Sequence, residues 1–115
     1  MREKMSINQL ADMVYRWADR QFPDRDPQQC WNKLLEETNE LFESPQDGKE
    51  YADVFILLLD LASLHGVDLE REILTKLEIN KMSTWTKDET TGTMRRIKDP
   101  ASDEITMYHY PEDYL

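Results

Sequence analysis

Apolar side chains recur every three to four residues in the first part of the 115-residue chain. Ser6 precedes the first of these runs, and a serine in that position accepts a hydrogen bond from a free N–H of the first turn. Asp26 and Pro27 open the second run in a similar way, since proline is tolerated at the first helical position. The pattern predicts helices over residues 6–21 and 27–44.

The segment after the loop "SPQDG" is apolar on nearly every side. Residues 49–65 hold no glycine or proline, and Gly66 follows as a stop signal. The run "VFILLL" is compatible with a buried strand, but the uninterrupted length favours a helix that is covered on both faces, as at a subunit interface. Asp68 is the expected cap of a fourth helix over residues 69–85. Its expected inward side chains are Ile73, Leu77, Met82 and Trp85.

Four helices with short connections predict an all-α fold, an antiparallel four-helix bundle. From Thr86 onward, "TKDETTGTMRRIKDP" contains a glycine turn and little helical periodicity. We therefore expect a helical domain over residues 1–87, followed by a turn and a C-terminal arm over residues 88–115. An extended arm that packs on its own or a neighbouring subunit and a disordered arm are both compatible with the composition.

Charge and composition exclude several classes of protein. The formal net charge of -10 argues against binding nucleic acid or an anionic membrane, where basic residues must neutralise phosphate. Cys30 is the only cysteine, so no intramolecular disulfide or cysteine zinc site is expected, and we expect it to be a small buried apolar residue. The longest apolar run, residues 54–59, is too short to span a bilayer. We expect a soluble, cytoplasmic protein.

Carboxylates gather on both sides of the loop that joins the second and third predicted helices. They are Glu36, Glu37 and Glu40 before the loop and Glu50 and Asp53 after it. Side chains three or four residues apart on a helix are neighbours, so each group shares a face. An antiparallel hairpin then places the two groups opposite each other, where their like charges repel. Such a cluster needs protons or cations.

Two interpretations of these acids stay open at this point. Solvated acidic faces are common, because glutamate is a good helix former. Ligation by oxygen atoms alone instead suits a hard cation such as Mg²⁺ or Mn²⁺ rather than zinc. Protein carboxylates that hold magnesium usually do so for a phosphate substrate, which indicates phosphoryl or nucleotidyl transfer to water.

The same residues resemble a known signature. "EETNE" at residues 36–40, followed by "EYAD" at residues 50–53, resembles the EExxE…ExxD motif of the MazG-like all-α nucleoside triphosphate pyrophosphohydrolases. The surrounding helices of that family resemble two further segments of this chain, "KLLEETNELFE" and "DVFILLLDLASLHGVDLEREILTKLEINKMSTW". The segment "RWADRQFPD" near the start of the chain adds to the resemblance. The resemblance covers residues 10–87 and is strongest to the short, often phage-encoded, dATP/dGTP pyrophosphohydrolase-like members.

The resemblance implies hydrolysis of a nucleoside triphosphate, with a purine deoxynucleotide expected, between the α and β phosphates. The implied cofactor is Mg²⁺, with Mn²⁺ as a substitute. The residues that match the family's magnesium ligands are Glu37, Glu40, Glu50 and Asp53. Glu36 matches an acid that ligates metal or orients the attacking water, and either Glu36 or Glu37 is the expected proton acceptor.

Further residues match positions near the substrate. Lys76, an expected catalytic residue, and Asn80 match positions on the fourth helix that approach the phosphates or the metal cluster. The family often has an arginine three residues after this asparagine, whereas this chain has Ser83. Other cations must then neutralise the phosphates, and the available ones are Lys81, Lys87, Arg95 and Arg96. Trp17 is the best placed tryptophan to stack on the base, although tryptophan on an apolar stripe is more often core.

Alternatives of other classes remain. The chain could bind nucleotide and metal without turnover, or it could be a helical interaction module whose acidic face binds a basic partner. For the enzyme we expect a homodimer or homotetramer in a bacterial cell or phage-infected host. Asp60 lies two turns after Asp53 and could extend the line of acids, but it is expected to be solvated or to face a subunit.

Overall fold

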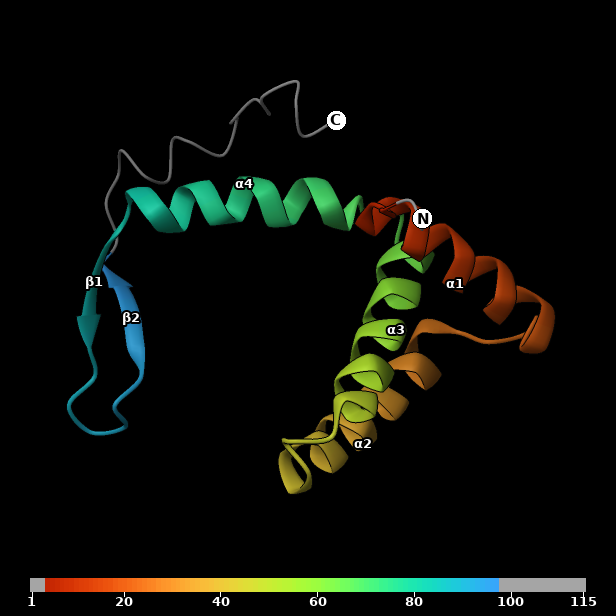
Figure 1. Ribbon diagram of the computed structural model, residues 1–115, viewed down its shortest axis with the longest axis horizontal. Coiled ribbons are helices and arrows are strands. Elements are labelled where there is room, and N and C mark those ends of the chain that lie inside the picture. Colours follow the sequence, from red (N-terminus) through yellow and green to blue (C-terminus); the bar gives the residue numbers. More distant parts are fainter. Residues whose placement is uncertain (1–3, 98–115) are drawn as a thin grey trace. The chain divides into compact units, whose positions relative to one another are not determined.

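The computed structural model describes residues 4–97, and four helices precede a two-stranded hairpin (Figure 1). The helices are α1 (Ile7–Gln21), α2 (Pro27–Glu43), α3 (Gly48–Leu64) and α4 (Leu69–Met82), and the strands are β1 (Thr84–Lys87) and β2 (Met94–Ile97). All four predicted helices are therefore confirmed. The part of the expected arm over residues 98–115 lies outside the described residues.

The chain divides into two compact units, residues 1–70 and 71–115. The first unit carries α1, α2 and α3, and the second begins near the start of α4 and includes the hairpin. No helix among residues 4–97 is long and apolar enough to cross a membrane.

Side-chain caps define where the first three helices begin. The Ser6 hydroxyl accepts a hydrogen bond from the backbone N–H of Gln9 at 3.1 Å, and the Gln9 side chain accepts one from the Ser6 N–H at 2.7 Å. Asp26 and Gln29 repeat this reciprocal capping at the start of α2. Asp47 caps α3 through the N–H of Lys49 at 3.0 Å. These caps satisfy N–H groups that have no partner within the helix.

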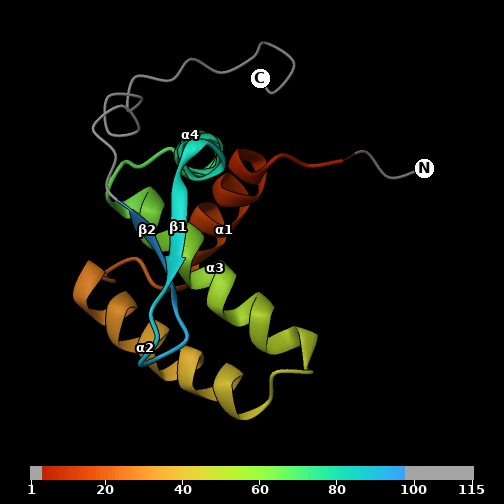
Figure 2. The same cartoon turned by 90° about the vertical axis from the view of Figure 1, so that its left-hand side faces the viewer.

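α3 is the central helix of the first unit, because both α1 and α2 pack against it. α2 and α3 form an antiparallel hairpin closed by a short turn, with the two helices side by side (Figures 1 and 2). The core between them is formed by Cys30, Leu34 and Leu61, with Val54, Leu57 and Leu64 packed around these. The expectation that Cys30 is buried is confirmed, since only 6% of its surface is exposed.

The prediction for Asp60 was wrong. Its side chain is 6% exposed and pairs with the Arg25 guanidinium at 2.8 Å. The helical pattern of α3 could not reveal this, because the partner lies in the connection between α1 and α2. Burial of a carboxylate inside an apolar helix surface requires such a partner.

The end of the fourth helix also differs from the prediction. α4 stops at Met82, and Trp85 lies in β1, where its indole N–H donates to the Asn80 carbonyl at 3.0 Å. The local sequence "STWT" is rich in β-branched and aromatic residues, which favour a strand. Gly92, at φ 77°, supplies the turn, and the antiparallel register pairs Trp85 with Arg96. Four side chains expected to face inward are between 38% and 49% exposed: Ile73, Leu77, Met82 and Trp85.

The core predicts a contrast between a buried and an exposed position of α2. Leu34 is 9% exposed, whereas Asn39 is an exposed polar residue. We expect Leu34→Ala to lower the free energy of unfolding by about 2–5 kcal/mol, because it removes buried methyl groups and leaves a cavity. Asn39→Ala is the control and should change the free energy of unfolding by less than about 0.5 kcal/mol. Urea unfolding measures both, and equal effects would contradict the core assignment.

Candidate metal centre

The acidic residues lie where α2 ends and α3 begins. Glu37 and Glu40 are in the last part of α2, Glu50 is in the first turn of α3, and a short turn joins the helices. The Asp47 N–H donates to the Ser44 carbonyl at 3.1 Å, which closes that turn. The hairpin therefore brings together carboxylates that the sequence separates.

Three of the predicted metal ligands form a cluster. Glu37, Glu40 and Glu50 each offer a carboxylate oxygen, and these oxygens all lie within 4.8 Å of one another. Asp53 is exposed, lies one turn after Glu50 and acts on it electrostatically. Glu36 is exposed and accepts a hydrogen bond from the Lys33 ammonium at 3.0 Å.

The electrostatics of the cluster are those of carboxylates in mutual repulsion. The pKa of Glu37 is lowered, first by a hydrogen bond with Glu40 and then by one with Lys33. The same hydrogen bond and the negative charge of Glu37 raise the pKa of Glu40. The pKa of Glu50 is raised by burial and by the charges of Asp53, Asp47 and Glu37. The pKa values of Glu37 and Glu40 thus move in opposite directions, because each carboxyl acts on the other.

Two carboxylate oxygens of these glutamates could accept a further hydrogen bond or bind a cation. Oε2 of Glu37 and Oε2 of Glu50 are buried and find no hydrogen-bond partner among residues 4–97. A buried carboxylate oxygen without a partner is costly unless something positive is bound there. Carboxylate oxygens are the ligands that Mg²⁺ and Mn²⁺ prefer, so the donor set fits a hard divalent cation.

Lys33 is a residue of this site that the sequence interpretation missed. Its ammonium lies 3.0 Å from Glu36 and 3.2 Å from Glu37, one turn further along the helix. The spacing of three and four residues between a lysine and two glutamates was the available signal. Lys33 supplies part of the positive charge that the cluster requires.

The remaining predicted site residues lie on other elements. Trp17 on α1 is 48% exposed, and its ring meets the Phe22 ring edge-on at 5.8 Å. Lys81 on α4 pairs with Glu78 at 3.4 Å, and Arg95 on β2 pairs with Asp88 at 3.0 Å. The others, also in the second compact unit, are Lys76, Asn80 and Arg96. Their roles at the substrate stay predictions.

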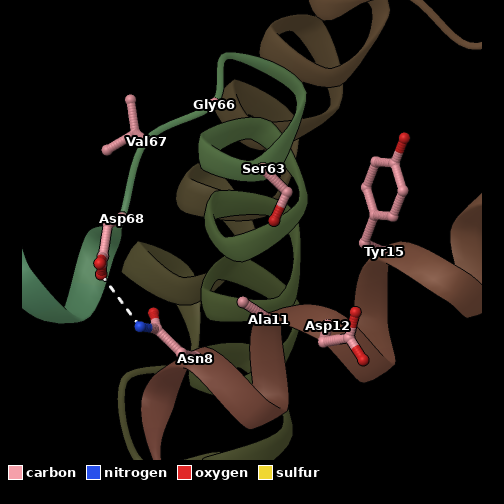
Figure 3. Close-up of a pocket in the computed structure, with 8 residues that line it drawn as sticks. All are labelled: Asn8, Ala11, Asp12, Tyr15, Ser63, Gly66, Val67 and Asp68. Atoms are coloured by element: carbon pink, nitrogen blue, oxygen red, sulfur yellow. Dashed lines mark hydrogen bonds between the residues drawn. The ribbon is translucent and has the colours of Figure 1, made fainter. Parts of the chain in front are cut away.

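A separate open pocket of about 400 Å³ lies between α1 and the end of α3 (Figure 3). Its wall contains a hydrogen bond from the Asn8 side chain to Asp68 at 3.0 Å. None of the clustered acids lines it, so it is distinct from the metal centre. The lining residues are Asn8, Ala11, Asp12, Tyr15, Ser63, Gly66, Val67 and Asp68.

Several known proteins are similar to this chain in sequence. The profile of a family described as dATP/dGTP pyrophosphohydrolase matches residues 10–103. A dATP/dGTP diphosphohydrolase of cyanophage S-2L is 42% identical over 100 residues, covering 85% of this chain and 92% of that protein. A dATP/dGTP diphosphohydrolase of Salmonella phage PMBT28 is 39% identical over 95 residues, which are 82% of this chain and 32% of that longer protein.

A solved structure is also similar. It is the cyanophage S-2L MazG-like pyrophosphohydrolase bound to dGDP and three catalytic Mn²⁺ ions per active site. The TM-score is 0.73 at 41% sequence identity, and the match covers 86% of this chain and 97% of that chain. The four-helix, MazG-type architecture expected from the sequence is confirmed by this likeness.

The raised pKa of Glu50 predicts a pH-dependent gain in stability for Glu50→Gln. A raised carboxyl pKa means that its stabilising contribution is complete below the ordinary glutamate pKa and is lost as pH rises through the folded value. In EDTA, the Gln variant should therefore melt at a higher temperature than wild type at neutral pH, with the difference vanishing at acidic pH. Thermal melts across pH measure this.

Glu72→Gln, at an exposed position on α4, is the control and should leave the pH profile of the melting temperature unchanged. Addition of Mn²⁺ should reverse the order at neutral pH, because wild type gains more stability from the cation than the Gln variant does. A Gln variant that is less stable than wild type at neutral pH in EDTA would contradict repulsion at the cluster.

Proposed function

Because the chain belongs to the dATP/dGTP pyrophosphohydrolase family, we propose that it hydrolyses dATP or dGTP between the α and β phosphates, giving the monophosphate and pyrophosphate. The resemblance inferred from residues 36–53 is thereby confirmed. The observation that carries the proposal is the acidic cluster, whose oxygens come from Glu37, Glu40 and Glu50. A MazG-like relative of the same architecture binds dGDP with Mn²⁺.

The clustered glutamates would hold the divalent cation, with Asp53 completing the set from the next turn of α3. The two buried oxygens without partners, on Glu37 and Glu50, support this assignment. A bound Mg²⁺ or Mn²⁺ lowers the pKa of a water ligand and neutralises charge on phosphate oxygens. A chain with a net charge of -10 needs such a cation to accept a polyanionic substrate at all.

Exposure and position favour Glu36 over Glu37 as the acceptor of the water's proton. Glu37 has a lowered pKa and a buried oxygen without a hydrogen-bond partner, which suits a ligand better than a base. Glu36 is exposed on the same helix next to it, where Lys33 orients its carboxylate at 3.0 Å. A general base must lie within reach of the water, and its oxygens must not be bound to the metal ion.

Basic and aromatic residues would complete substrate binding. Lys76 and Asn80 are the proposed contacts to phosphate, and Trp17 is the proposed platform for the base because half of its surface is accessible. Ser83 does not replace the missing arginine, since its hydroxyl donates to the Ile79 carbonyl at 2.6 Å. The additional cations proposed for the phosphates are Lys81, Arg95 and Arg96.

Glu37→Gln and Asp53→Asn should each reduce pyrophosphate release from dATP and dGTP by at least about a hundredfold, because each removes a proposed metal ligand. EDTA should abolish the activity of wild type. Glu36→Gln should lower kcat by about 10²–10⁴-fold with little change in KM, as expected for a base. Release of pyrophosphate and formation of the monophosphate are measured together.

Glu43→Gln is the control, an exposed glutamate at the end of α2 that lies outside the cluster, and it should retain wild-type turnover. Metal-dependent stabilisation without any turnover would favour the alternative of a nucleotide and metal binder. Turnover that survives both Glu37→Gln and Asp53→Asn would contradict the proposed metal centre.

We infer that the enzyme is a homodimer or homotetramer that acts in the cytoplasm of a bacterial cell or phage-infected host, where its substrates are found. Large apolar side chains are exposed on the two hairpin helices, which supports a subunit interface there. They are Trp31, Leu35 and Phe42 on α2 and Phe55, Ile56 and Leu58 on α3.

Phe55→Glu should shift the assembly toward the monomer, because it places a charge on the exposed apolar face of α3. Phe55 is 37% exposed in the single chain. Gln28→Glu adds the same charge at an exposed polar position and should leave the assembly intact. Sedimentation equilibrium measures the mass of each. A wild-type protein that sediments as a monomer at all concentrations would refute this inference.

A further inference from the structure

A buried ion pair lies in the first unit away from the acidic cluster. The Arg25 guanidinium donates through Nε to Oδ2 of Asp60 and through Nη2 to Oδ1, each at 2.8 Å. The side chains are 7% and 6% exposed. Nη1 of Arg25 also contacts Asp19 at 3.4 Å and the Phe22 carbonyl at 3.3 Å, and the guanidinium lies 5.2 Å from the centre of the Tyr15 ring.

This pair connects every element of the first unit. Asp19 and Tyr15 are on α1, Asp60 is on α3, and Arg25 directly precedes Asp26, the residue that caps α2. On α2 itself, the Cys30 thiol contacts Oδ2 of Asp60 at 3.8 Å. The interaction therefore fixes the start of α2 on α3, at the end of the hairpin opposite to the turn.

The separation between the ion pair and the acidic cluster can be counted in turns along both helices. Asp60 follows Asp53 by two turns on α3, and Cys30 precedes Glu37 by two turns on α2. The turn therefore joins α2 and α3 on one side of the acidic cluster, and the ion pair joins them on the other side. The apolar contacts between them, around Leu34, have no preferred direction.

A forked arginine–carboxylate pair does not tolerate shifts of one helix along the other, because two parallel hydrogen bonds fix both direction and distance. A buried ion pair is also poor evidence for stability, since well-packed apolar residues of similar volume are often as stable. A geometric role therefore explains the Arg25–Asp60 pair better than a contribution to stability does. A hard divalent cation demands close to ideal positions from oxygens that come from two different helices.

We propose that Arg25 and Asp60 are positioning residues that hold α2 and α3 in the register at which Glu37, Glu40 and Glu50 bind a divalent cation. This rests on the proposed function only through the metal centre. The repulsion among the acids pushes the helices apart while no cation is bound, and the pair resists that displacement at the open end of the hairpin. Loss of the pair thus leaves the ligands present but misplaced.

The test separates geometry from stability. The double variant Arg25→Met with Asp60→Leu replaces the pair by apolar side chains, so its melting temperature in EDTA should stay close to that of wild type. Its dissociation constant for Mn²⁺, measured by calorimetry without nucleotide, should rise by about tenfold or more. Arg25→Lys keeps the charge but loses the fork, and should give an intermediate rise.

Ser6→Ala is the control, because it removes the cap of α1 and lowers the melting temperature without touching the pair. It should leave the Mn²⁺ dissociation constant at the wild-type value. The proposal is overturned if the double variant folds and binds Mn²⁺ as tightly as wild type. If the double variant does not fold, equal Mn²⁺ affinity of Arg25→Lys and wild type overturns it.

Binding and turnover also distinguish this proposal from the proposed function. A wild-type protein that binds Mn²⁺ but releases no pyrophosphate would refute the activity, while the ratios of Mn²⁺ dissociation constants would still decide the role of Arg25 and Asp60. A wild-type protein that binds no Mn²⁺ would overturn the positioning role as well.

Discussion

Repulsion among carboxylates is the constraint on which this protein depends. Glu37, Glu40 and Glu50 present oxygens within 4.8 Å of one another. In addition, Oε2 of Glu37 and Oε2 of Glu50 are buried and have no hydrogen-bond partner among residues 4–97. A fold selected for stability alone would separate such groups, because each desolvated charge near another of the same sign is unfavourable. The arrangement is understandable when the cluster exists to attract a divalent cation, and through that cation an anionic substrate.

The rest of the first unit opposes this repulsion. α3 is apolar nearly all round, so it can serve as the common support for α1 and α2. The turn at residues 44–47 brings the acids together, the apolar core around Leu34 and Leu61 holds the helices in contact, and Lys33 neutralises part of the charge. The buried pair of Arg25 and Asp60 adds directional contacts at the other end of the hairpin.

Much of this was accessible from the sequence because local signals agreed with one another. Caps at Ser6 and Asp26 and the stop at Gly66 placed the helices, and the spacing of acids on either side of a short loop predicted their convergence. The ion pair could not be predicted, since Arg25 and Asp60 are 35 positions apart and no helical spacing relates them. The hairpin of β1 and β2 was missed because each strand is only four residues long.

Hydrolysis of dGTP in water labelled with heavy oxygen tests most directly whether the carboxylate cluster serves attack on the α phosphorus. Mass spectrometry of both products would locate the incorporated oxygen. We expect the label in dGMP and unlabelled pyrophosphate, with no reaction when EDTA removes the divalent cation. Label in pyrophosphate, or release of labelled orthophosphate, would place the attack at another phosphorus and contradict the proposed role of these acids.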